Sequence, residues 1–171
     1  KFPTAVQEAG QALLQTLTPD VAKQKARLDE LEAALAGGDK ERGHLIFNSP
    51  RAVCSTCHTI GYLGGKVGPD LTRIGQIRTE RDLLESIVYP SSNFVRSYEP
   101  TLVRTKDGEE YGGVLREESG DSVALVSGAG TEQRFARADI VENRPGTVSI
   151  MPEGLDQQLS KQEMADLVAF L

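Results

Sequence analysis

The sequence VCSTCHTI, residues 53–60, contains the pattern Cys-x-x-Cys-His that attaches haem c covalently. On one helical turn the sulfurs of Cys54 and Cys57 lie on the same side, where they can bond the two vinyl groups of a haem. The same turn places His58 under the iron as an axial ligand. These three residues are therefore the predicted attachment site.

Two other interpretations of the motif are weaker. A structural zinc site needs four ligands at a spacing that the sequence lacks, and His44 lies before the motif rather than after it. A thioredoxin-like disulfide is expected beside a βαβ pattern, which is also missing. Haem c, one group bound through both cysteines, is the favoured cofactor.

The segment GGKVGPDLTRIG follows the motif after a few residues and fits the same site. A metal-bound histidine generally gives its second ring N–H to an acceptor, which fixes the orientation of the ring. A turn at Gly68 and Pro69 can present such a carbonyl, while Leu71 and Ile74 can cover the haem face. An ordinary Gly-Pro-Asp turn is the alternative.

The second axial ligand is sought by elimination among Met151, Met164 and His44. Met164 lies inside a helical pattern typical of core residues. His44 lies on the helix before the motif, where a solvated or capping role is favoured. Met151 lies in a loop before Pro152, from which a thioether can reach iron. Met151 is therefore the favoured ligand, and a loop methionine that fills a gap is the alternative.

The haem propionates have no assigned partners. Arg73, Arg78 and Tyr62 are near enough in the sequence to be considered, but a solvated surface group is the favoured interpretation of each.

Helical patterns surround the motif. The sequence predicts helices over residues 4–17, 19–36, 39–47, 79–89 and 159–171, with Asp39, Thr79 and Ser160 as caps. Gly43 on one of them allows an aromatic of the last helix to approach, so we expect the two to cross tightly.

Residues 98–143 have a different pattern. Short alternating runs are separated by the turn sequences KDG, SGD and GAG. They predict a five-stranded antiparallel meander, curled into a small barrel, inserted into a helical domain. The runs are PTLVRT, EEYGGVLRE, DSVALVS, EQRFA and ADIVE.

Composition limits the function classes. The 171 residues carry a formal charge of -6 with no basic cluster, which argues against nucleic-acid binding. No run reaches the roughly 18 apolar residues of a membrane span. The chain starts at Lys1 without a signal-peptide pattern, and we interpret it as a processed protein or an excised domain.

Together these motifs resemble a class I cytochrome c, and more closely the haem-binding domain of Planctomycete and Verrucomicrobial type. The quoted segments from GDKERGHLIF through CSTCH, GGKVGPDLTRIG, LLESIVYPSSNF and TKDGEEYGGVL to MPEGLDQQLSKQEMADLVAFL carry this resemblance. It implies covalent haem c with His58 and Met151 as axial ligands. It also implies one module of a larger exported redox protein, sometimes with a propeller dehydrogenase domain.

The expected fold is a mainly α cytochrome c fold with the inserted antiparallel β unit, α+β overall. The haem domain is expected over 38–97 and 144–171, the β insert over 98–143, and a helical extension over 1–37.

The expected function is electron transfer, without enzymatic activity of its own, from a dehydrogenase domain or partner and outside the cytoplasm. One alternative is a haem sensor or small-molecule-binding protein with a displaceable Met151. Another is a docking protein in which the β insert binds a partner strand.

Overall fold

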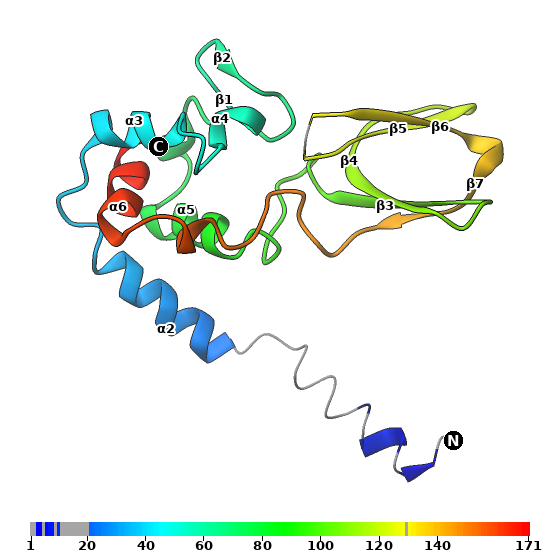
Figure 1. The fold of residues 1–171 in the computed structure, drawn as a ribbon, viewed down its shortest axis with the longest axis horizontal. Helices are drawn as coiled ribbons and strands as arrows, with labels where there is room; N and C mark the ends of the chain where they lie inside the picture. The colour runs from blue at the N-terminus through cyan, green and yellow to red at the C-terminus, as the bar shows by residue number, and fades with distance from the viewer. Residues whose placement is uncertain (1–2, 5, 9, 11–20, 129) are drawn as a thin grey trace.

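The computed structural model describes residues 3–4, 6–8, 10, 21–128 and 130–171. Most of the helix predicted over residues 4–17 lies outside these residues. Figure 1 shows most of the helices gathered at one end of the molecule and the large five-stranded sheet at the other. The α-helices are α2 (Val21–Glu32), α3 (Lys40–Phe47), α4 (Cys54–Cys57), α5 (Glu80–Val88) and α6 (Lys161–Phe170).

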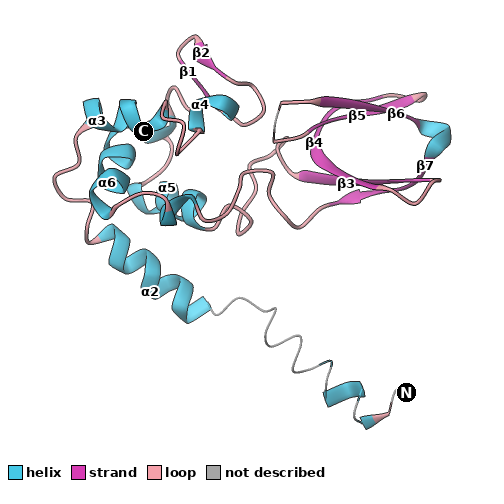
Figure 2. Ribbon diagram, in the orientation of Figure 1, coloured by secondary structure: helices cyan, strands magenta, loops and turns pink. Residues whose placement is uncertain are grey.

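Short 3₁₀ helices and strands complete the fold (Figure 2). The 3₁₀ helices are η1 (Ile74–Gln76), η2 (Arg137–Asp139) and η3 (Leu155–Gln157). A small hairpin pairs β1 (Thr59–Ile60) with β2 (Leu63–Gly64). The large sheet contains β3 (Pro100–Thr105), β4 (Glu110–Glu118), β5 (Ser122–Val126), β6 (Glu132–Ala136) and β7 (Ile140–Pro145).

Side-chain caps start the helices at the predicted residues. The Asp39 carboxylate accepts the backbone N–H of Arg42 at 2.8 Å. Thr79 and Ser160 each form a complete capping box at α5 and α6. These caps satisfy N–H groups that have no partner inside the helix, so the local sequence sets each start.

Helices α3 and α6 cross at Gly43, as predicted. A Cβ built on Gly43 would lie 2.0 Å from the backbone oxygen of Asp166 and 2.6 Å from the Cβ of Phe170, so only glycine permits this approach. The Arg42 guanidinium donates two hydrogen bonds of 2.7 Å to the buried Asp166 carboxylate across the crossing. The crossing joins the start of the motif-bearing region to the end of the chain.

Helix α2 packs into the same core as the other helices. Its Leu28 and Leu31, with Leu35 just beyond its end, are buried against residues of α3, α5 and α6. Arg81 of α5 forms ion pairs with Asp29 and Glu32 of α2. The domain boundaries given above remain a prediction.

The large sheet has the order β6-β5-β4-β3-β7, with all neighbours antiparallel. It curls around its own core, to which every strand contributes. This core contains Val103, Val123 and Leu125, with Tyr111, Leu115, Phe135 and Ile140 packed against them. The curled sheet is called the β unit below.

Two predictions about this architecture are wrong. The fold is not mainly α: it is α+β, because the β unit has its own core and the helices beside it contain only four to twelve residues each. The five strands are antiparallel and the sheet is curled, as predicted, but the described strands lack the last pair of the predicted meander, because β6 and β7 do not pair. The 3₁₀ helix η2 lies between β6 and β7 in the chain, and β7 pairs with β3 at the other side of the sheet.

Candidate functional site

The predicted motif forms a single turn of helix, α4, beside an apolar pocket. Val53 precedes the turn with φ 49°, a left-handed conformation that is uncommon for a β-branched residue. Cys54 faces the pocket, and its thiol lies 3.5 Å from the backbone oxygen of Ala52. Burial raises the pKa of the Cys54 thiol to about 11. The turn therefore places one of its two sulfurs in the pocket wall.

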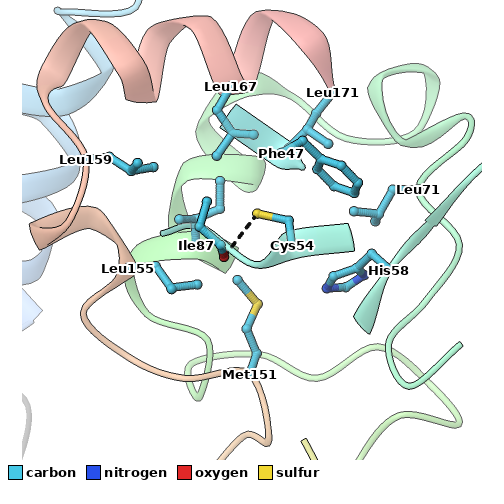
Figure 3. Close-up of a pocket in the computed structure, with 11 residues that line it drawn as sticks. Phe47, Cys54, His58, Leu71, Ile87, Met151, Leu155, Leu159, Leu167 and Leu171 are labelled. Carbon is cyan, nitrogen blue, oxygen red and sulfur yellow. Dashed lines mark hydrogen bonds between the residues drawn. The ribbon is translucent and has the colours of Figure 1, made fainter. Parts of the chain in front are cut away.

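The pocket encloses about 390 Å³ of empty space, part of which is open to solvent, and its lining is almost entirely apolar. Figure 3 shows the Met151 side chain extending from its loop toward the middle of this pocket, with the His58 ring at one side. The pocket thus brings together two donors that are 93 residues apart in the sequence. Its lining is Phe47, Ala52, Cys54, His58, Leu71, Ile87, Met151, Leu155, Leu159, Leu167 and Leu171.

The His58 ring is oriented by the segment that follows the motif. Its Nδ1 lies 2.9 Å from the backbone oxygen of Pro69, and this hydrogen bond places the proton on Nδ1 and leaves Nε2 as the ligating nitrogen. Burial lowers the pKa of His58, an effect that the Pro69 hydrogen bond opposes. The lowered pKa favours the neutral imidazole that metal ligation requires.

Glycines allow this segment to lie directly on the motif. A Cβ on Gly68 would lie 2.6 Å from Cε1 of His58, and one on Gly65 would lie 1.8 Å from the backbone oxygen of Thr56. Gly64, with φ +115°, approaches the backbone oxygen of His58 in the same way. Gly64 and Gly65 belong to the segment GGKVGPDLTRIG but had no predicted role. The Gly-Gly pair is the feature of the sequence that indicates such a close backbone approach.

The remaining predicted site residues lie at different distances from the pocket. Leu71 lines it, and Ile74 packs against the helical core beside it. Cys57 points away from it and packs against the β unit, with its thiol 3.4 Å from the backbone oxygen of Gly128. Burial raises the pKa of Cys57 as well.

The Met151 loop is held by serine side chains. The Met151 N–H donates to Oγ of Ser149 at 3.1 Å, and the Ser149 N–H donates to Oγ of Ser91 at 3.1 Å. Ser91 Oγ in turn donates to the Glu153 carboxylate. The loop is therefore fastened to the end of α5.

The other ligand candidates lie away from the pocket lining. His44 is exposed and its ring contacts Phe170 at 5.2 Å between centroids, and Met164 is buried in the helical core. Tyr62 at the β1–β2 turn is fully exposed. Arg73 and Arg78 are exposed, and the charge of Arg78 interacts with the Asp82 carboxylate. Nothing in these positions assigns a propionate partner.

Sequence reasoning missed much of the pocket lining. Ile87, Leu155, Leu159 and Leu167 were recognised at most as apolar positions of helices or loops. Helical periodicity indicates a buried face for Ile87 and Leu167, whereas Leu155 and Leu159 lie at and after η3. Neither pattern indicates which buried residues border a cavity.

The donors fit a haem iron better than a free metal ion. Among the described residues, no group of three or more His, Cys, Asp or Glu side chains is placed to hold a metal ion. One imidazole nitrogen and one thioether in an apolar pocket suit haem iron, which takes only its two axial ligands from the protein. The space that Gly68 leaves for the His58 ring supports the same fit.

Comparison with protein-family models gives no match for this chain, and no curated protein matches it either. No helix in the described part of the chain is long and apolar enough to cross a membrane.

Proposed function

We propose that this chain is an electron-transfer protein that carries one haem c, bound through Cys54 and Cys57 with His58 and Met151 as axial ligands. The observation that carries the proposal is the common pocket of His58 and Met151, with Cys54 in its wall. A Cys-x-x-Cys-His turn and a distant methionine have no structural need to share one apolar cavity. The resemblance described above points to the same class.

Attachment needs no oxidant. Each cysteine thiol would add across one vinyl double bond, forming a sulfur–carbon bond while its proton passes to the other vinyl carbon. Cys54 lines the pocket, where its thiol would add to one vinyl group. Cys57 packs against the β unit, so its thiol would have to leave the Gly128 oxygen to reach the other. Covalent bonding then keeps the group in place independently of the axial ligands.

The side chains of the pocket set the conditions for electron transfer. The bound haem supplies a one-electron couple whose potential a methionine ligand raises. Pro69 fixes the orientation of His58 through its carbonyl, and Ser149 holds the backbone of Met151. The apolar lining would limit solvent access to the group and so help to set its reduction potential.

Ligation from both sides separates this function from its alternative. With His58 and Met151 both bound, no axial position is open to a substrate, which favours an electron carrier over a sensor or an enzyme. We propose a dehydrogenase domain or a redox partner protein as the source of electrons, and an extracytoplasmic location, where haem c attachment normally takes place.

The test is to express the chain with a cytochrome c maturation system and record the spectrum of the oxidised protein. We expect a mass increase of one haem and the weak far-red charge-transfer band of an iron–methionine bond. Met151→Leu should abolish the band and lower the reduction potential. Met164→Leu, in the only other methionine of the chain, is the matched control and should keep both.

Two results would contradict the proposal. One is a wild-type protein that gains no covalent haem. The other is rapid and complete binding of carbon monoxide by the reduced protein, which would show an open axial position and support the sensor.

A further inference from the structure

The β unit packs directly against the motif-bearing region. Val67 from the segment after the motif is buried between Val114 of β4 and Val126 of β5. These three residues form a core that is separate from the core of the helices and from that of the β unit. We call it the junction cluster; Cys57, Tyr98 and Ile150 pack against it.

One side of the junction cluster supports the histidine. Val67 immediately precedes Gly68 and Pro69, the residues that contact the His58 ring and accept its hydrogen bond. The Arg116 guanidinium of β4 also donates a hydrogen bond to the backbone oxygen of Lys66. The β unit therefore holds the segment that orients His58 at two consecutive residues.

The other side supports the methionine. Ile150, the residue before Met151, packs against the junction cluster. The turn between β5 and β6 reaches the same place, because a Cβ on Gly128 would lie 3.1 Å from the backbone oxygen of Ile150. The end of β5 and the turn after it therefore contact Cys57, which precedes His58, and Ile150, which precedes Met151.

The Cys57 contact behaves differently from the rest. Its thiol lies 3.4 Å from the Gly128 oxygen, but a thioether sulfur has no proton to donate. After attachment this hydrogen bond is lost, whereas the apolar packing of Val67, Val114, Val126 and Ile150 does not depend on the protonation of sulfur. The valines are therefore the residues that can act in the haem-bound protein.

We propose that the β unit is a positioning device for the haem site: Val114 and Val126, through Val67 and Ile150, set the geometry of His58 and Met151. The inference rests on the proposed function and deepens it. It differs from an independent docking appendage, which would bury its apolar residues in its own core and leave the ligand-bearing segments to the helices. Here the buried surface is shared.

The first experiment compares two valines on one strand. Val126→Ala removes side-chain volume from the junction cluster, whereas Val123→Ala removes the same atoms from the core of the β unit. Both are made in the haem-loaded full chain. We measure the reduction potential, the far-red band and the dissociation constant of imidazole, which competes with Met151.

We expect Val126→Ala to bind imidazole about threefold to tenfold more tightly than wild type, because a less firmly held Met151 competes less well for the iron. A change of this size corresponds to the coupling energies measured between residues in contact. Its potential should shift and its far-red band should weaken. Val123→Ala should lower the melting temperature while leaving imidazole affinity and potential at the wild-type values. Equal behaviour of the two variants would overturn the inference.

A second pair adds volume and keeps the test decisive if Val126→Ala does not fold. Gly128→Ala places a methyl group against Ile150, whereas Gly120→Ala, at the turn between β4 and β5, has nothing within 4 Å. We expect tighter imidazole binding for Gly128→Ala and no change for Gly120→Ala. Unchanged imidazole affinity in Gly128→Ala would count against the positioning role.

The proposed function and this inference fail in distinguishable ways. A wild-type chain without covalent haem, or without the methionine band, overturns the proposed function and the inference with it. A wild-type chain with both features, whose junction variants match their controls, overturns only the inference.

Discussion

Replacing Gly68 by alanine should disturb the site through a single contact. Gly68 does not have a positive φ, so alanine there carries no left-handed backbone strain. The new Cβ would lie 2.6 Å from Cε1, 2.8 Å from Nδ1 and 3.0 Å from Nε2 of His58. In a strain-free position the same change would stabilise the chain by about 0.4–1 kcal/mol, because it restricts the unfolded state. Any loss of stability must therefore come from the ring.

The size of the effect follows from these distances. Carbon atoms in contact lie about 3.5 Å apart or more, so ring and segment must separate by roughly 0.9 Å at Cε1. The Nδ1 hydrogen bond to Pro69, now 2.9 Å, does not survive a shift of that size. Its loss costs about 1 kcal/mol and overpacking about 1–3 kcal/mol. After subtraction of the gain, we expect a net loss of about 1–3 kcal/mol.

The assay has two parts. Urea unfolding of the haem-free chain measures the free energy, with Gly120→Ala as the control that adds the same methyl group in open space. In the haem-loaded chain, loss of the Pro69 hydrogen bond should weaken the iron–histidine bond, since such outer contacts are worth about 10–100-fold in metal affinity. A Gly68→Ala protein as stable as wild type, with an unchanged spectrum and potential, would refute this reasoning.

Other predictions concern the helical core. Gly43→Ala should destabilise the chain by about 1–3 kcal/mol in urea unfolding, although alanine has the higher helix propensity, because the methyl group meets the backbone of α6. Leu28→Ala should cost about 2–5 kcal/mol, whereas Val21→Ala on the exposed side of α2 should stay within about 0.5 kcal/mol of wild type; equal effects would show that α2 does not belong to the core. The Arg42 guanidinium lowers the pKa of Asp166 below its usual 3.8. Because a lowered folded-state pKa stabilises only above the unfolded value, this contribution is lost as the pH falls below about 3.8, and Asp166→Asn should show a shallower acid loss of stability than wild type.

The sequence was most informative where neighbouring residues decide the structure. The caps at Asp39, Thr79 and Ser160 satisfy N–H groups within their own first turn, so these helix starts could be predicted. The turn sequences KDG and SGD likewise fixed the first hairpins of the β unit. The close helix crossing at Gly43 was recognisable because a glycine and an aromatic occupied matching helical positions.

Long-range pairing was less predictable. The alternating pattern of ADIVE is that of a strand, but it contains no information about which neighbour the strand joins, so the absence of a β6–β7 pair from the described sheet was missed. The separate fates of Cys54 and Cys57 were also missed. The motif predicts both sulfurs on one side of a turn. In the structure Cys57 contacts Gly128 of the β unit, 71 residues later in the chain, while Cys54 lines the pocket. The fold was predicted to be mainly α because the β unit was treated as an insert. Its strands in fact form a separate hydrophobic core.

The pairing of β3 with β7 has a consequence for how the chain folds. Thr101 lies opposite Pro145, and the Gly146 N–H donates to the Pro100 oxygen at 2.7 Å, so the two ends of the β unit leave it side by side. Once this pair has formed, the chain between His58 and Met151 is effectively about half as long, which lowers the entropic cost of bringing them together by about 0.6 kcal/mol. The saving is small, but it gives folding a preferred order. The hairpins of the β unit join neighbouring segments and can form early. Met151 is then connected to the pocket by a shorter effective loop, so its contact with the pocket can form afterwards.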